Sequence, residues 1–491
     1  MAFFDSVILA LLVFVLLWLL GRKHSRQLHL PPGPTGLPLL GNLLQLDRRA
    51  PYKSVVKLSQ SYGPVIMVNT GLQRVVFLVG YDAVKEALVD HADDFNGRGP
   101  LPFLIKITRG YGLVISNGER WRQLRQFTLS TLRDFGMGRK GMEQWIQEES
   151  SHLVERIKTM NGEPFDPTFF LSCSVSNVIC CLVFGERFSY DDKHFLHLLQ
   201  NISQIITSMS SPWAALYNIF PRLMEWLPGK HQKAFKSIEE LREFVTEKVK
   251  DHEDTLAPNS PRDYIDCFLT RAIKEKGTST EFHYDNLVST VLNMYAAGTE
   301  STSSTIRFAL TLLIKYPEIQ ERMQKEIDCV IGQERFPFME DRKSLPFVDA
   351  VLHEVQRFID FVPLGAPHYA LHNITFRGYT IPKGTMIFAV LHSVLKEDKQ
   401  WATPFLFNPR HFLDQNDNFK KNPAFLPFSA GKRACVGESL ARMEIFLFLV
   451  RLLQRFTFSC PGGPDSIVLT PEFSSFANVY RRYNIIATPR C

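Results

Sequence analysis

This chain of 491 residues has no closely spaced CxxC pair of cysteines and no strong excess of charge of one sign. Its eight cysteines show no CxxC spacing, which disfavours a disulfide framework and indicates a reduced compartment. The 56 Lys and Arg residues are scattered among 50 Asp and Glu residues, so the net charge is only +6. No long basic tract marks a nucleic-acid site, and we therefore expect no nucleic-acid partner.

Long apolar runs are also scarce, and the clearest one lies at the N-terminus. Val7 to Leu20 is unbroken apolar sequence, and with Ala2 to Phe4 it approaches the ~20 residues that span a bilayer. Arg22, Lys23 and Arg26 follow it, which keeps that side cytosolic. The alternative, a cleaved signal peptide, would carry its charge before the apolar core and a small-residue site after it. We predict an uncleaved signal anchor over residues 1–21.

The remaining chain shows one internal boundary. The stretch LPPGPTGLPLLGN, Leu30 to Asn42, favours extended chain and turns, which makes a stiff connector. No repeat or low-complexity segment follows. We predict a basic, Pro/Gly-rich hinge over 22–42 and one catalytic domain over 43–491.

The periodicity of that domain indicates a helix-rich body. Val65 to Val79 predicts two strands around a turn with Gly71, and residues 375–390 predict further short strands. The longest helical pattern runs from about Asp285 to Tyr316, where Pro317 ends it. Further helices are predicted over Trp121 to Leu132, Pro317 to Ile331 and Leu345 to Phe358.

Cys435 lies between Gly431 and Gly437, just ahead of another apolar helical pattern. Glycine lets the backbone turn tightly and lets a large group approach, and a helix N-terminus favours an anion such as a thiolate. The alternative is a cysteine that packs as a small hydrophobe. Zinc would need further Cys or His ligands nearby, and none occur. A single thiolate on a metal implies a prosthetic group that supplies the other ligands, as haem does.

The stretch FSAGKRACVG, Phe428 to Gly437, fits F-x-x-G-x-R-x-C-x-G and resembles the haem-binding loop of the cytochrome P450 family. The resemblance covers essentially the whole chain and is closest to the microsomal, drug-metabolising second family of vertebrates. It implies a mainly α fold with small β-sheets, in a single large domain behind the N-terminal membrane anchor. It also implies haem b (iron protoporphyrin IX) on Cys435 and a location at the endoplasmic reticulum membrane, with the catalytic domain on the cytosolic face.

The same resemblance assigns roles to polar residues. Glu354 and Arg357 of HEVQRF match the family's ExxR, and His411 would complete a structural network with them. Two other pairs, Glu119/Arg122 and Glu239/Arg242, have the same spacing, for which a surface ion pair is the usual explanation. The family's partners of the haem propionates are matched by Arg98, Trp121, Arg125, His368 and Arg433.

The stretch AAGTESTSST lies inside the long helix. Ala297, Ser301 and Thr305 recur every four residues and share a face, which could simply permit close helix packing. By resemblance, Glu300 and Ser301 form a catalytic proton relay, and Gly298 leaves room for dioxygen. Serine stands where the family usually has threonine, so the methyl group that restricts χ1 is lost.

A substrate pocket is implied along several segments, although any of its residues could be ordinary core. It would include Leu101, Phe103, Asn293, Ala297, Val362, Leu364, Phe473 and Phe476. The pocket-facing part of the long helix offers Asn293 rather than an acid. We therefore expect neutral or anionic lipophiles, such as fatty acids, steroids or neutral xenobiotics, to be preferred over basic amines.

Three activities are compatible with these motifs. The favoured one is a monooxygenase that inserts one atom of O2 into a lipophilic small molecule. The alternatives are a haem-thiolate isomerase or dehydratase acting on peroxides without O2, and a non-catalytic haem or ligand carrier; the proton relay argues against both. The first needs electrons from NADPH through a separate reductase in the same membrane, with cytochrome b5 as a further partner and membrane lipid as a contact. Residues flanking the cysteine loop could form a basic docking face: Lys420, Lys421, Lys432 and Arg442.

Overall fold

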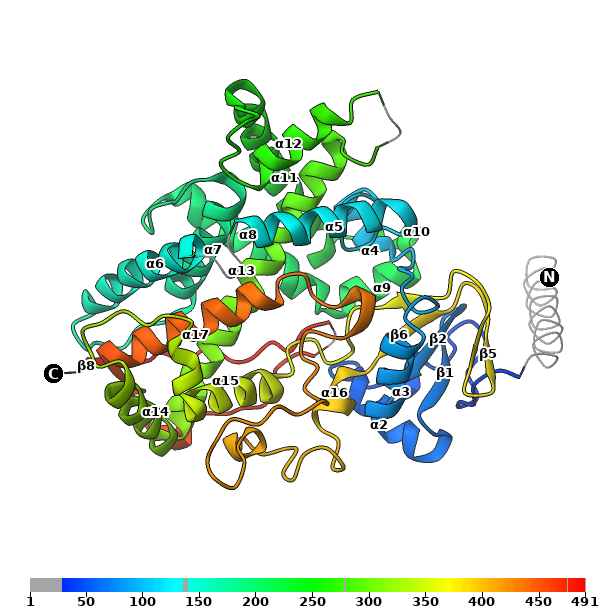
Figure 1. Ribbon diagram of the computed structural model, residues 1–491. Helices are drawn as coiled ribbons and strands as arrows, with labels where there is room; N and C mark the ends of the chain where they lie inside the picture. The colour runs from blue at the N-terminus through cyan, green and yellow to red at the C-terminus, as the bar shows by residue number, and fades with distance from the viewer. Residues whose placement is uncertain (1–28, 136–139, 278–279, 475, 491) are drawn as a thin grey trace, which may run out of the picture.

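The computed structural model describes residues 29–135, 140–277, 280–474 and 476–490 (Figure 1). The predicted anchor, residues 1–21, and the first part of the hinge lie outside those ranges. Within them, no helix combines the length and the apolarity needed to cross a bilayer.

The body is mainly helical, as predicted. The helices are α2 (Pro51–Tyr62), α3 (Tyr81–Lys85), α4 (Pro102–Thr108), α5 (Gly118–Asp134), α6 (Lys140–Lys158), α7 (Thr168–Phe184), α8 (Lys193–Met209), α9 (Pro212–Ile219), α10 (Pro221–Met224), α11 (Lys230–Thr255), α12 (Tyr264–Lys274), α13 (Tyr284–Lys315), α14 (Pro317–Val330), α15 (Pro346–Ile359), α16 (Leu391–Leu395) and α17 (Glu438–Arg455).

The strands are short and form small sheets. They are β1 (Val65–Thr70), β2 (Gln73–Leu78), β3 (His368–Tyr369), β4 (Ile374–Phe376), β5 (Tyr379–Ile381), β6 (Met386–Ala389), β7 (Phe456–Ser459) and β8 (Ile486–Pro489). The main sheet has the order β1-β2-β6-β3. Its β1–β2 hairpin turns at Gly71, whose φ of 64° favours glycine, as the sequence predicts.

The described part of the hinge packs against this sheet. The N–H group of Met67 in β1 donates to the carbonyl of Pro32 at 2.9 Å. A Cβ on Gly33 would lie 1.8 Å from the carbonyl oxygen of Met67, so only glycine permits this approach. A hydrophobic cluster that includes Tyr52, Val55 and Val68 lies between α2 and the sheet.

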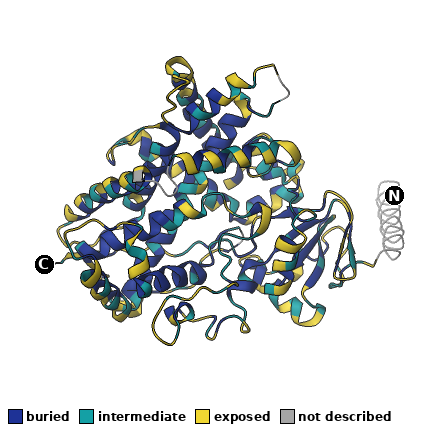
Figure 2. Cartoon of the chain, in the orientation of Figure 1, coloured by how far each residue is buried: buried dark blue, intermediate teal, exposed yellow. Residues whose placement is uncertain are grey.

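Helix α13 crosses the centre of the molecule (Figure 1) and packs against α7, α15 and α17. With 32 residues it is about 48 Å long, and most of its residues are buried, chiefly on either side of residues 293–301 (Figure 2). A Cβ on Gly298 would lie 2.8 Å from Cδ1 of Ile179, so glycine at this position allows α13 to approach α7. This contact gives Gly298 a packing role, next to the oxygen-pocket role that the resemblance implied.

Candidate functional site

The Cys435 loop is held against the turn of helix that contains Leu88. Gly431 has φ of 70°, and a Cβ there would lie 1.7 Å from the carbonyl oxygen of Leu88. The N–H group of Cys435 donates to the carbonyl of Phe428 at 3.0 Å, which closes the loop. Helix α17 begins three residues after Cys435, so the predicted position ahead of a helix N-terminus is confirmed.

The Cys435 thiol has accessible surface, yet protein surrounds it. Burial raises the pKa of this thiol, while the N–H groups of Gly437 and Glu438 and the charge of Arg125 oppose the rise. The guanidinium of Arg125 also donates to the carbonyl of Ala434 at 2.7 Å. A positive centre bound to the sulfur would add to these groups in favouring the thiolate.

Arg98, Arg125 and Arg433 lie together beside this loop. Arg433 donates to the carbonyls of Asn96 and Ser116, both at 2.7 Å, and its guanidinium carbon lies 4.0 Å from the centre of the Trp121 ring. Burial, with Arg98 and Arg125 nearby, lowers the pKa of Arg433 to about 8. Burial also lowers the pKa of Arg98 to about 10.

Asn117, at the start of α5, connects two of these arginines. Its side chain exchanges two hydrogen bonds with the backbone of Arg98, both 2.7 Å, and accepts a third from Arg433 at 3.3 Å. Arg98 also donates to the carbonyl of Pro367 at 2.8 Å. The next residue, His368, is buried and bonds the carbonyl of Phe95 through Nδ1. Burial and the neighbouring arginines hold the pKa of His368 well below its usual range.

This cluster has the composition of an anion site. Among the described residues, no carboxylate lies within ion-pair range of Arg98, Arg125 or Arg433, and the buried Nε of Arg98 has no hydrogen-bond partner. Unpaired buried cations are costly. The two propionates of haem b are such anions, and Cys435 is the matching iron ligand, so the residues present fit this cofactor.

Glu354 and Arg357 form a fully buried pair in α15 with two contacts of 2.7 Å. Arg357 also donates to the carbonyls of residues 395, 404 and 406 at 2.7–2.9 Å, and it faces the Trp401 ring. His411 contacts Glu354 at 3.1 Å through Nδ1. Because Nε2 of His411 accepts the N–H group of Thr403 at 3.2 Å, Nδ1 carries the ring proton and donates to Glu354.

The other two pairs with ExxR spacing are different. Glu119 and Arg122 form an exposed ion pair of 2.6 Å on α5. Arg242 is buried, but its contact with Glu239 is 3.5 Å and the acid is half-exposed. Burial of both partners therefore separates Glu354 and Arg357 from the matches that spacing alone produces.

Glu300 and Ser301 have separate partners on α13. The Ser301 hydroxyl donates to the carbonyl of Ala297 at 2.7 Å. The carboxylate of Glu300 accepts a bond from Ser304 at 3.3 Å. Burial raises the pKa of Glu300, with Arg307 and Ser304 opposing the rise.

The neighbouring Thr302 faces α17 instead. It interacts with Glu444, a fully buried acid whose Oε1 has no hydrogen-bond partner among the described residues. Burial holds the pKa of Glu444 well above its usual range, and Thr302 opposes the rise. Thr302 therefore contributes to the contact between α13 and α17.

The expected pocket residues have mixed surroundings. Phe103 is buried against the rings of Tyr217 and Phe235. Leu364 lies in the hydrophobic cluster beside the sheet, and Phe473 is exposed. The remaining side chains keep some accessible surface: Leu101, Asn293, Ala297, Val362 and Phe476.

Asn293 connects α13 to the loop that follows α4. Its Oδ1 accepts the N–H groups of Leu113 at 3.1 Å and Val114 at 3.2 Å. A Cβ on Gly112 would lie 2.8 Å from the same oxygen. The amide oxygen is therefore committed to the protein backbone.

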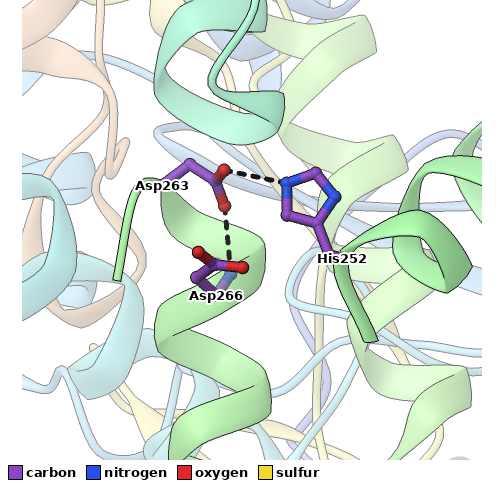
Figure 3. Close-up of side chains that lie close together, drawn as sticks. All are labelled: His252, Asp263 and Asp266. Atoms are coloured by element: carbon purple, nitrogen blue, oxygen red, sulfur yellow. Dashed lines mark hydrogen bonds and ion pairs between the residues drawn. The ribbon is translucent and has the colours of Figure 1, made fainter. Parts of the chain in front are cut away.

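A second group of ligand-type side chains lies at the start of α12 (Figure 3). His252 Nε2 lies 2.8 Å from Asp263, and its Nδ1 bonds the carbonyl of Lys248. Arg262 donates to both oxygens of Asp266, at 2.6 and 2.9 Å. Each of the three side chains thus has hydrogen-bonding partners within the protein, so the group is explained as an ion-pair network.

The thiol-bearing loop, the arginine cluster and the central helix define the class of a haem-thiolate protein. The sequence model of "Cytochrome P450" matches residues 31–485. Cytochrome P450 2F3 of Capra hircus is 47% identical over 487 residues, covering 99% of each chain. Cytochrome P450 2G1 of Oryctolagus cuniculus is 48% identical over 488 residues, covering 99% of this chain and 98% of its own.

The chain belongs to the cytochrome P450 family. The expected reaction class and cofactor are thereby confirmed: it is a haem-thiolate monooxygenase that acts on lipophilic molecules with O2 and with electrons from NADPH through a reductase.

Three residues of the site were missed from the sequence. Asn117 precedes the glycine and acid that begin α5, which is a helix-start signal that could have indicated it. Ser304 lies four residues after Glu300 on the same helix, a spacing that could have indicated their contact. Glu444 carries no such signal, because its contact depends on how α17 packs against α13.

Proposed function

We propose that the Cys435 thiolate holds the iron of haem b and that Arg98, Arg125, Arg433 and His368 bind its propionates. The observation that carries this assignment is the arginine cluster beside a cysteine at a helix start, with no acid in ion-pair range among the residues that the structure describes. Trp121 would support Arg433 by stacking. The Glu354–Arg357–His411 network would hold the neighbouring chain. Bound haem supplies the activation of dioxygen, and the chain supplies position, a dry surrounding and protons.

Glu300 and Ser301 are proposed as the proton relay. A carboxyl group whose pKa is raised can hold a proton, and a hydroxyl can pass one on. The Ser301 hydroxyl must leave the carbonyl of Ala297 to do so, and without the threonine methyl its χ1 rotation is less restricted.

The relay is tested by coupling efficiency. Ser301→Ala should divert more NADPH to peroxide and water per product, and Ser301→Thr should divert the same amount or less. Equal coupling in Ser301→Ala and the parent would remove Ser301 from the relay.

A groove along α5 is proposed as the reductase docking surface. It has a volume of about 470 Å³ and includes exposed Arg133, together with Arg125, which is also assigned to a propionate, and Arg122, which pairs with Glu119 at 2.6 Å. Of the flanking cations expected to dock the partner, Lys432 pairs with Asp93 and Arg442 pairs with Glu438 at 2.9 Å. The other two expected cations, Lys420 and Lys421, are exposed and would add positive charge to the docking surface. Positive charge there would favour an acidic partner surface. Cytochrome b5 would use the same face.

Charge reversal tests the docking surface. Arg133→Glu should slow NADPH-supported turnover, most strongly at low salt, and leave peroxide-supported turnover unchanged. Lys158→Glu, on the separate helix α6, is the control. Equal loss in both assays would indicate damage to the site instead.

Membrane attachment is proposed at two places: the predicted anchor and an exposed apolar patch. The patch consists of residues 37–44, Leu72 and the helices α9 and α10. The β1–β2 turn meets α9 where Gly71 lies against Ile219. The side chains of Trp226 and Leu72 are 88% and 77% exposed. Large apolar side chains that gather on one exposed surface mark a site of contact with a membrane or another protein. We place the protein at the endoplasmic reticulum membrane with its body in the cytosol.

Deletion and substitution test the two contacts separately. Removing residues 1–21 should leave the haem spectrum intact and make much of the protein extractable by salt. Adding Trp226→Asp should lower the remaining binding to lipid vesicles. Protection of body peptides from protease in sealed microsomes would contradict the orientation.

Neutral or anionic lipophiles are the proposed substrates. The Asn293 amide oxygen is used by the backbone. Glu225 is half-exposed and pairs with Lys106 at 3.6 Å. Matched ligand pairs that differ in one amine test this preference. A consistently higher kcat/KM for the amine member would contradict it.

A further inference from the structure

A small cavity lies on the side of α13 that carries Ser304 and Arg307. It has a volume of about 10 Å³ and is enclosed by α13, the end of α15 and residues 478–485. Exposed Arg481 lines one part of it, and buried Asn478 lines another. The cavity therefore extends inward from the protein surface.

Two buried polar atoms that find no partner in the described part of the chain belong to residues that line this cavity. Nη1 of Arg307 is a donor without an acceptor, and Oδ1 of Asn478 is an acceptor without a donor. The orientation of the Asn478 amide is fixed, because its Nδ2 donates to the carbonyls of Ile359 at 3.2 Å and Asp360 at 2.6 Å. Asn478 is only 5% exposed, so its oxygen has little access to bulk water.

A single water placed between Arg307 Nη1 and Asn478 Oδ1 would satisfy both atoms. A cavity of roughly 10–15 Å³ on this measure is just large enough for one water, which also needs at least two polar partners. Water can accept from Arg307 and donate to Asn478 at the same time.

The Ser304 hydroxyl connects this cavity to Glu300. Ser304 lines the cavity and bonds Oε1 of Glu300 at 3.3 Å. Its neighbour Ser303 is different, since that hydroxyl bonds the backbone carbonyl of Glu300 at 3.4 Å. Ser304 is thus the side chain that touches both the carboxyl group and the cavity.

We propose that Ser304 is the residue through which Glu300 exchanges protons with solvent, by way of a water held between Arg307 and Asn478. The hydroxyl gives its proton to the carboxylate and takes one from the water, so Ser304 ends the step unchanged. The water recovers its proton from solvent on the Arg481 side. Arg307 and Asn478 are positioning residues that hold the water.

The inference rests on the proposed role of Glu300, but its test does not require turnover. In the full-length, haem-loaded and substrate-free protein, infrared spectroscopy at mildly acidic pH follows hydrogen–deuterium exchange of the Glu300 carboxyl, assigned by its loss in Glu300→Gln. Ser304→Ala should slow this exchange by at least about tenfold, as loss of a proton-transfer group does. Ser304→Thr should restore the rate, and Ser303→Ala should leave it unchanged.

A high-resolution crystal structure tests the water itself. We expect an ordered water within hydrogen-bond distance of Arg307 Nη1 and Asn478 Oδ1, and its loss in Arg307→Met. Parent-like exchange in Ser304→Ala, or an empty cavity in the parent, would overturn the inference. If Ser304→Ala slows exchange while Ser301→Ala leaves coupling unchanged, the entry route stands and the proposed relay fails.

Discussion

The guanidinium group of Arg433 lies over the indole of Trp121, 4.0 Å from the ring centre, with no acid beside it in the described chain. Burial, with two further arginines nearby, lowers the pKa of Arg433 to about 8. Such an arrangement is unfavourable by itself and becomes favourable when an anion joins it.

Arg433→Gln should therefore act in opposite directions on the two forms of the protein. Haem affinity should fall by at least about tenfold, because losing one partner of a buried charge pair costs about 2–5 kcal/mol. The haem-free protein should become more stable. Haem titration by Soret absorbance and denaturant unfolding measure the two effects, with exposed Arg122→Gln as the control. Unchanged haem affinity would contradict the assignment of Arg433.

The Glu354–Arg357 pair gives a stability prediction with a matched control. Arg357→Lys keeps the charge but cannot make the bidentate contact or reach the same carbonyls, so it should lower the free energy of unfolding by about 3 kcal/mol or more. Arg122→Lys, in an exposed pair of equal spacing, should change it by about 0–1 kcal/mol. Equal effects in the two variants would show that burial of the first pair is unimportant.

Glu444 should tolerate an amide but not a hydrocarbon. Burial raises the pKa of the Glu444 carboxyl, so an uncharged amide suits the same place: Glu444→Gln should keep the contact with Thr302 and remove the proton uptake that folding requires above pH 4.5. Glu444→Leu should lower stability by about 1–3 kcal/mol by leaving Thr302 unpaired.

The pH dependence of Glu444→Gln follows from the raised pKa. The unfolded carboxyl ionises near 4.5 and the folded one at higher pH, so the parent loses stability as pH rises above 4.5 until the folded pKa is reached. The stability advantage of Glu444→Gln should grow over that range and vanish below it. Denaturant unfolding across pH measures it, and a constant difference would contradict the prediction.

His252 should stabilise the start of α12 only when protonated. Burial alone would lower its pKa, but the bond and the charge of Asp263 outweigh that effect and raise it. The stabilisation is therefore complete below the ordinary pKa of 6.5 and is lost as pH rises through the folded pKa. The side chain of Asp263→Asn can still accept the N–H group of Asp266 and so cap α12, but it lacks the charge that favours protonated His252. The variant should therefore show a weaker dependence of stability on pH. Thermal unfolding across neutral pH checks it, and an identical slope would contradict it.

The fold was predictable where local signals were strong. From Pro317 we predict that the long helix ends at Tyr316, one residue after its observed last residue, Lys315. Gly71 correctly indicates the turn of the β1–β2 hairpin. The haem-thiolate class followed from ten residues around Cys435. The ExxR spacing alone could not distinguish Glu354–Arg357 from the other two pairs. The three pairs differ in burial, and the spacing of two residues in the sequence carries no information about burial. The contact of Glu444 with Thr302 depends on how α17 packs against α13, whereas the pairs Arg442–Glu438 and Ser304–Glu300 are four residues apart on one helix, a spacing that the sequence does contain.

The Cys435 thiolate is the centre of this account, and the spectrum of the reduced, carbon-monoxide-bound protein tests it most directly. Thiolate ligation gives a strongly red-shifted Soret band. We expect that band in the parent protein and its complete loss in Cys435→Ala, while Cys329→Ala, at an exposed thiol, keeps it. A normal red-shifted band in Cys435→Ala would contradict the assignment of the iron ligand.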